Sequence, residues 1–129
     1  MDLLPLRLAP GTDLRRALEQ AGSTGAFVVS GMGSLREVHL RFAGAAEASV
    51  LTGDYEIISL AGAITLDGAH LHMAVADGAG QVRGGHVAYG NIVRTTAEIL
   101  LVATTGWQLA RQFDAGTGYA ELTVRRASN

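Results

Sequence analysis

The chain has 129 residues, no cysteine, a net charge of −2 and ten basic residues, all of them arginine. A chain of this length forms one domain, over residues 1–129, with an apolar core of its own. Without cysteine it has no disulfide framework, thiolate metal site or thiol nucleophile. No apolar run approaches the ~20 residues of a membrane helix, and no basic and apolar signal peptide is visible. We therefore expect a single cytoplasmic domain.

The first part of the chain combines short strands with one helix. Residues 4–9 alternate apolar and other side chains, as a strand does. A segment with an apolar helical stripe follows Thr12, a favoured N-cap residue, and Gly22 ends it. The remaining elements expected here are a buried strand over 25–30, a turn or bulge over 31–35, a strand over 36–42 and a loop over 44–49.

The rest of the chain is rich in strands. A continuous apolar end indicates that residues 95–104 form a central strand. Residues 106–113 could form a short second helix, because Trp107, Ala110 and Arg111 stand at helical spacing. The other strands expected are 55–66, 70–76, 81–88 and 119–124. Antiparallel strands with one main N-terminal helix and a short second helix indicate an α+β domain with a curved or barrel-like sheet.

Three of the four histidines lie within seventeen residues, at His70, His72 and His86. Positions i and i+2 of a strand share a face, so His70 and His72 project together. A three-residue loop closed by Gly80 in the left-handed conformation places His72 opposite His86, whereas a two-residue loop turns His86 away. A bulge at 84–85 would also restore the shared face. The loop therefore decides whether the three histidines meet.

Three imidazoles on one face describe a possible metal site. Neutral imidazole is the commonest metal ligand, and three of them with an open fourth position are typical of catalytic zinc. A lone histidine in a strand is more often a packing or surface residue, and we interpret His39 in this way. For the other three, spacing alone leaves a metal-binding and a structural role both open.

Several motifs occur in an order that is characteristic of one family. Residues 33–35 read GSL, 53–62 read GDYEIISLAG, 68–72 read GAHLH, 84–86 read GGH and 95–99 read TTAEI. Together these motifs resemble the PPC domain that plants and prokaryotes share, with its G-x-F/Y-E-I-x-S-L-x-G signature. The resemblance covers nearly the whole chain.

The resemblance implies an α+β fold built on an antiparallel sheet, and a homotrimer. The composition agrees with an assembly, because 48% hydrophobic and 17% charged residues leave much apolar surface to cover. In plants the domain follows an Arg-Gly-Arg-Pro AT-hook that binds A/T-rich DNA, and this sequence contains no such element. Prokaryotic members with histidines at the positions of His70, His72 and His86 look like metal-containing proteins. The resemblance therefore implies a metal ion at these three residues, with zinc as the leading candidate.

Two carboxylates are candidates for completing this site. Glu56 and Glu98 lie in the family motifs, on strands that we expect to neighbour the histidine hairpin. A carboxylate beside zinc can be a fourth ligand, orient an imidazole or act as general base toward bound water. Alternatively, each forms an ordinary salt bridge at a strand edge or subunit interface. Asp67 and Asp77 lie in turns, where aspartate bonds its own backbone.

Two functions of different classes follow. The first is a metal-dependent protein, with zinc or another divalent transition metal, that binds or transforms an unknown small molecule. The second is a trimeric DNA-binding or regulatory scaffold without catalysis. The sequence has no basic run interleaved with aromatic residues, and its acidic net charge opposes DNA binding, so we favour the first.

Overall fold

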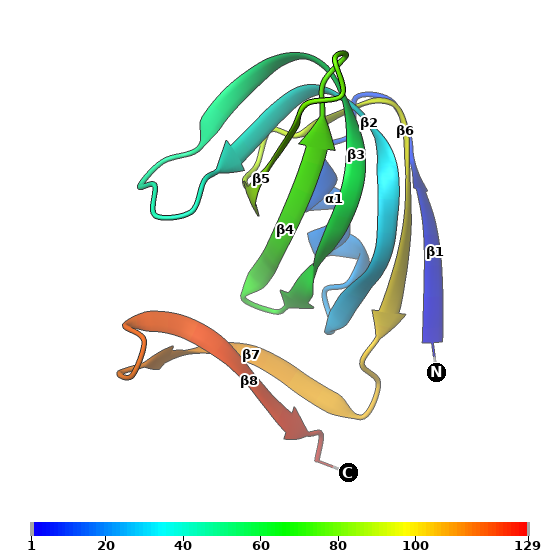
Figure 1. The fold of residues 1–129 in the computed structure, drawn as a ribbon. Coiled ribbons are helices and arrows are strands. Elements are labelled where there is room, and N and C mark those ends of the chain that lie inside the picture. Colours follow the sequence, from blue (N-terminus) through cyan, green and yellow to red (C-terminus); the bar gives the residue numbers. More distant parts are fainter. Residues whose placement is uncertain (1, 129) are drawn as a thin grey trace.

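A computed structural model of the protein describes residues 2–128 (Figure 1). Within them lie a six-stranded sheet, one helix and a separate two-stranded hairpin. The elements are β1 (Asp2–Leu8), α1 (Leu14–Ala21), β2 (Ala26–Arg41), β3 (Ser49–Thr65), β4 (Gly68–Ala76), β5 (Val82–Val87), β6 (Ile92–Ala103), β7 (Trp107–Asp114) and β8 (Tyr119–Arg126). The strand order of the large sheet is β1-β6-β2-β3-β4-β5. The expected α+β class, with an antiparallel sheet and an N-terminal helix, is confirmed.

The large sheet curls until its last strand meets an inner one. Besides β3 and β6, β2 also pairs with β5, where Arg41 lies opposite His86. Strand β2 reaches three partners because it is 16 residues long and is bent by register shifts. The segment 31–35, expected as a turn or bulge, lies inside this strand, and one shift falls between Gly33 and Leu35. This curl brings the end of β2 beside the histidine hairpin.

Helix α1 packs against the sheet through Leu14 and Leu18, both fully buried. Its N-cap is Asp13, one residue after the expected Thr12. One carboxylate oxygen accepts a hydrogen bond from the Arg16 N–H at 3.2 Å, and the other accepts one from the Gly90 N–H at 2.8 Å. The Thr12 hydroxyl has one oxygen, whereas the Asp13 carboxylate has two. Asp13 can therefore cap the helix with one oxygen and hold the loop at Gly90 with the other. No helix of residues 2–128 is long and apolar enough to cross a membrane.

The short second helix expected over 106–113 is wrong. Residues 107–113 lie in β7, which pairs one to one with β8. The hairpin closes through Gly118 (φ +81°), whose N–H donates to the Asp114 carbonyl at 2.7 Å. A partner strand so close in sequence supplies backbone hydrogen bonds along one edge of the whole segment, and this outweighs the helical spacing of three side chains. The hairpin is tied to the turn between β3 and β4, where Asp67 Oδ2 accepts a hydrogen bond from the Arg111 N–H at 2.8 Å.

Candidate metal centre

A three-residue loop closes the hairpin of β4 and β5. The Asp77 N–H donates to the Gln81 carbonyl at 3.0 Å, and Gly80 adopts φ +78°, a conformation that favours glycine. The Asp77 carboxylate accepts two backbone N–H groups of the loop, each at 2.9 Å, as expected for a turn aspartate. Of the loop lengths considered, the three-residue loop is correct. Pairing then continues without a bulge to His72 opposite His86.

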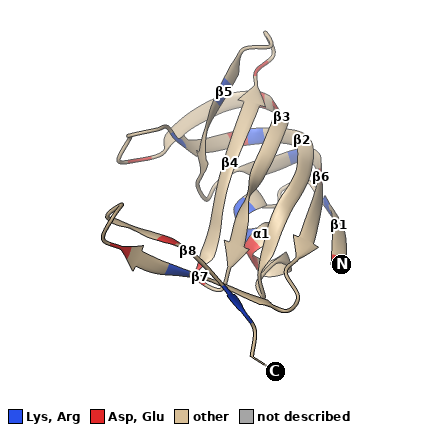
Figure 2. Cartoon of the chain, turned by 60° about the horizontal axis from the view of Figure 1, so that its bottom comes forward, with Lys and Arg blue, Asp and Glu red and all other residues tan. Residues whose placement is uncertain are grey.

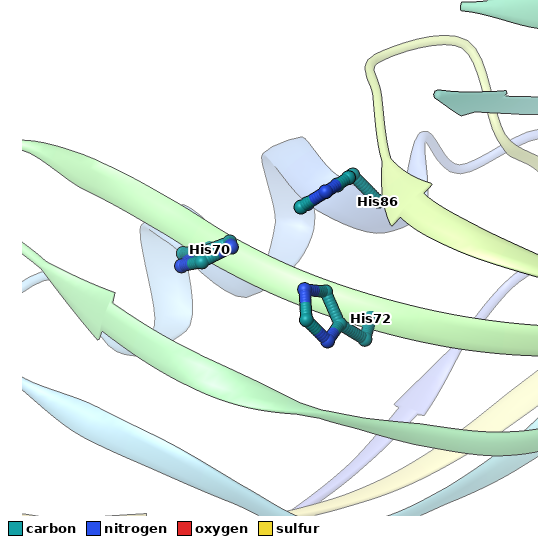
Figure 3. Close-up of side chains that lie close together, drawn as sticks. All are labelled: His70, His72 and His86. Carbon is teal, nitrogen blue, oxygen red and sulfur yellow. The ribbon is translucent and has the colours of Figure 1, made fainter. Parts of the chain in front are cut away.

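The side chains of His70, His72 and His86 converge on one point (Figure 3). One ligand atom can be taken from each so that all three lie within 4.8 Å of one another. Ring centroids are 4.7 Å apart for His72 and His86, 5.1 Å for His70 and His72, and 5.5 Å for His70 and His86. Nitrogens bound to tetrahedral zinc lie roughly 3.3 Å apart, so small side-chain rotations bring these three to bonding distance. Three neutral nitrogens fit zinc and leave one coordination position open.

The surroundings of the site favour neutral imidazoles. Burial is the main cause that lowers the pKa of His70 below 6.5; the Arg111 guanidinium and the other two imidazoles add to this, and Glu121 opposes it. Burial also lowers the pKa of His86, with Arg41 as the next cause. A lowered pKa keeps both rings neutral at pH 7, which is the form that binds a metal ion.

Two glycines allow neighbouring strands to approach the histidines closely. At Gly62 on β3 (φ +149°), a Cβ would overlap the carbonyl oxygen of His70. At Gly85 on β5, a Cβ would lie 2.7 Å from the carbonyl oxygen of Arg41. A larger residue at either position would push two strands apart beside a histidine. Both glycines therefore belong to the framework that holds the site.

A cavity of about 750 Å³ opens beside His70 and His86. Its charged lining residues, apart from these histidines, are Arg15, Arg41, Asp67, Arg111 and Glu121. They come from α1, β2, β7, β8 and the turn between β3 and β4. The carboxylate of Asp67 was expected to bond the backbone of its own turn, but it instead accepts the Arg111 N–H of β7.

No sequence pattern predicted that the arginines of this cavity lie beside the histidines. Arg41 stands opposite His86, so both side chains project to the same face of the sheet. This pairing joins segments 45 positions apart through the curl of β2, which no local spacing reveals. Arg111 lay in the segment interpreted as a helix. One sequence signal could have identified 106–113 as a strand. The alternation of 119–124 predicts a final strand, which needs a partner, and 106–113 is the nearest segment upstream.

Neither Glu56 nor Glu98 lies among the three histidines. Glu56 is on β3 opposite Ala76, four residues along β4 from His72, which is roughly 13 Å on an extended strand. Glu98 is on β6 opposite Met32, and β6 pairs with β1 and β2, not with the histidine hairpin. Of the two strands expected beside the hairpin, only that of Glu56 is there. A catalytic role for either carboxylate stays a prediction.

The fourth histidine lies apart from this site. Nε2 of His39 is 2.9 Å from Oε1 of Glu37, and its backbone N–H donates to Oδ1 of Asn91 at 2.9 Å. Asn91 is completely buried and also donates from Nδ2 to the His39 carbonyl at 2.9 Å. His39 therefore has a packing environment, as interpreted from the sequence.

Residues 1–105 match the sequence profile of the Plants and Prokaryotes Conserved (PCC) domain. The chain belongs to this family. The resemblance to the PPC domain that its motifs suggested is thereby confirmed, since both names describe the same plant- and prokaryote-conserved domain. The β7–β8 hairpin follows the matched residues.

Known proteins extend the comparison over nearly the whole chain. The protein is 42% identical over 128 residues to the bifunctional protein GlmU of Synechococcus sp. (strain JA-3-3Ab), covering 96% of this chain and 21% of that one. The chain thus spans about a fifth of that curated relative. A hypothetical protein from Salmonella enterica is 38% identical, with a TM-score of 0.92 and 97% and 94% of the two chains covered. A metal-containing protein from Archaeoglobus fulgidus is 27% identical, with a TM-score of 0.77 and 95% and 94% covered.

Proposed function

We propose that this domain binds one divalent metal ion, with zinc as the first candidate, at His70, His72 and His86. The open coordination position serves to bind or transform a small molecule in the adjoining cavity. The observation that carries the proposal is the convergence of three imidazoles within 4.8 Å beside a cavity of about 750 Å³. The similar structure from Archaeoglobus fulgidus, described as that of a metal-containing protein, supports it.

Different residues of the chain set the geometry of this site and the protonation state of its histidines. The strand pairing of β4 with β5 sets the three rings on one face, and burial with Arg41 and Arg111 keeps His86 and His70 neutral. When bound, zinc acts as a Lewis acid and makes a coordinated water acidic, with a pKa of about 7 in three-histidine sites. Glu121 lines the cavity near His70, so its carboxylate is placed to face a molecule bound there.

Elemental analysis of protein purified without chelator tests the metal. We expect about one ion per chain, and a loss of most of it in each of His70→Ala, His72→Ala and His86→Ala. His39→Gln is the matched control, because it removes an imidazole outside the site and should keep the metal. Wild-type protein that holds no metal, and takes up none when zinc is added, would overturn the proposal.

We further propose that the domain works as a homotrimer. Large apolar side chains of β1, β2 and β3 are more than half exposed: Leu3 54%, Val29 57%, Met32 54% and Ile58 57%. Such surface is costly in water for a small chain, and a second copy of the same chain would cover it. Glu98, opposite Met32, would then lie at the subunit interface. A salt bridge at such an interface is the alternative to a role in the metal site.

The DNA-binding alternative finds no specific support among residues 2–128. Basic and acidic residues are scattered over the strands without a continuous basic stripe (Figure 2). The net charge of −2 adds a general repulsion from phosphates. We expect no gel shift with duplex DNA at low or moderate salt; a salt-sensitive shift would revive the alternative.

A further inference from the structure

Three arginines face the cavity beside the histidines, from three different elements. Arg15 lies on α1, Arg41 on β2 and Arg111 on β7. Asp67 and Glu121 are the acidic residues of the lining, and Glu19, outside the lining, pairs with Arg15, so within residues 2–128 the unpaired positive charge of the cavity wall lies at Arg41 and Arg111. A bound divalent ion would add to it. Arginine is the side chain suited to carboxylates and phosphates, because its N–H groups donate in parallel pairs.

Two of these three guanidinium groups have no acidic partner within residues 2–128. Arg41 and Arg111 form no ion pair there. Arg15 pairs with Glu19, its Nε 3.6 Å from Oε2, but this Nε is buried and has no hydrogen-bond partner in the described part of the chain. Since a guanidinium carries five N–H donors, much of the donor capacity in this cavity stays free.

Two of the three arginines are nevertheless held in place. Arg41 donates from one terminal nitrogen to the Ala45 carbonyl at 3.1 Å. Arg15 donates in the same way to the Val87 carbonyl at 3.0 Å, and its guanidinium lies 4.3 Å from the centre of the Tyr89 ring. Side chains fixed before a ligand arrives lose little entropy on binding it. The cavity therefore presents a preorganised group of donors next to the candidate metal.

We infer that the cavity recognises a small ligand with an oxyanion group, a carboxylate or a phosphate ester, through Arg41 and Arg111. This inference rests on the proposed function, because a second oxygen of the ligand would reach the metal held by the histidines. Arg41 and His86 are opposed in the sheet, where Cβ atoms lie about 4.5–5.5 Å apart, so both ends of a small molecule can be engaged at once.

Titration of the zinc-loaded protein with inorganic phosphate and with acetate, followed by NMR at low salt, tests the inference. We expect both probes to shift signals of cavity residues, and acetamide, which has the shape of acetate without its charge, to shift none. The probe that binds with the higher affinity identifies the anionic group of the ligand, a phosphate ester or a carboxylate. Arg41→Gln and Arg111→Gln should each weaken binding by about tenfold or more, since each loses a charge-assisted hydrogen bond.

The matched control is Arg94→Gln. Arg94 is exposed, pairs with Asp54 at 3.3 Å and does not line the cavity, so its loss should leave anion binding unchanged. Arg41→Lys and Arg111→Lys, which keep the charge, should retain part of the affinity, and circular dichroism verifies that each variant is folded. Equal weakening in Arg94→Gln would overturn the inference, because it would reflect only overall charge.

Zinc content, measured on every sample, separates this inference from the metal proposal. Protein that holds zinc but binds neither anion, or binds it equally well in Arg41→Gln and Arg111→Gln, overturns the inference and leaves the metal site standing. If the wild-type protein holds no zinc, the metal proposal fails. Arginine-dependent binding of anions by the metal-free protein would then still support recognition of an oxyanion by the cavity.

Discussion

His72 and His86 lie directly opposite each other on β4 and β5, with ring centroids 4.7 Å apart and ring planes at 83°. Their relationship depends on the parity of the loop that joins the strands. A loop one residue shorter would slip the pairing by one and send His86 to the other face. The candidate ligand set is thus a consequence of turn chemistry at Asp77 and Gly80.

Replacing Gly80 with alanine should destabilise the metal-free protein by about 1 kcal/mol, because an L-residue is strained at the φ of +78° found there. Gly78 in the same loop is the control. Its φ is not in the left-handed region, a Cβ would meet nothing within 4 Å, and Gly78→Ala should be neutral or slightly stabilising. Urea unfolding measures both, and equal effects would contradict the assigned turn.

Gly62→Ala should be much more damaging, by roughly 3 kcal/mol or more, because φ strain combines with overlap of the new Cβ and the His70 carbonyl oxygen. Gly53 on the same strand also has positive φ, +109°, but a Cβ there has open space. Gly53→Ala should therefore cost only the conformational term, about 1 kcal/mol. Chemical denaturation and zinc content together test this, and equal costs would show that β3 and β4 are not so close.

His72→Ala should abolish the stabilisation of the protein by zinc. An ion that binds only the folded state, supplied at a hundred times its Kd, raises the free energy of unfolding by about 2.7 kcal/mol. Thermal unfolding with and without zinc should show this rise in the wild type and in His39→Gln, and not in His72→Ala. A rise that persists in His72→Ala would place the metal elsewhere.

Zinc binding should weaken as the pH falls, because protons compete for the imidazoles. The pKa of His70 lies below 6.5, chiefly through burial and then through Arg111, so that ring stays neutral to a lower pH than a free histidine. In Arg111→Gln this pKa moves back toward 6.5. Relative to its own affinity at pH 8, the variant should therefore lose zinc at a higher pH than the wild type.

Equilibrium dialysis at stepped pH measures this displacement. Arg94→Gln serves again as the control, since Arg94 pairs with Asp54 and is not among the causes that lower the pKa of His70. Its normalised pH profile should coincide with that of the wild type. Coincident profiles for all three proteins would show that Arg111 does not act on His70 in solution.

Met32→Asp should dissociate the proposed trimer, because it places a charge in the exposed apolar surface of β2 that a second copy would cover. Val82→Asp is the matched control: Val82 is 58% exposed but lies on β5, at the far end of the strand order from β1. Light scattering at micromolar concentration should report a trimer for the wild type and Val82→Asp, and a monomer for Met32→Asp. A monomeric wild type would refute the assembly.

Local sequence determined the histidine site. Alternation on a strand places His70 and His72 on one face, and an aspartate and a glycine at the right positions of the turn set the register of His86. The helix and its end at Gly22 follow from equally short-range patterns. These features are predictable because hydrogen bonds and torsion angles within about ten residues decide them.

Tertiary structure alone decided what surrounds that site. Arg41 meets His86 because β2 curls far enough to pair with β5, and Glu98 lies away from the hairpin because β6 inserts between β1 and β2. Residues 107–113 form a strand because β8 supplies backbone partners that the segment itself does not contain. Pairings between distant segments depend on the packing of the whole core, so the metal ligands can be read from a hairpin, while the charged cavity beside them requires the folded chain.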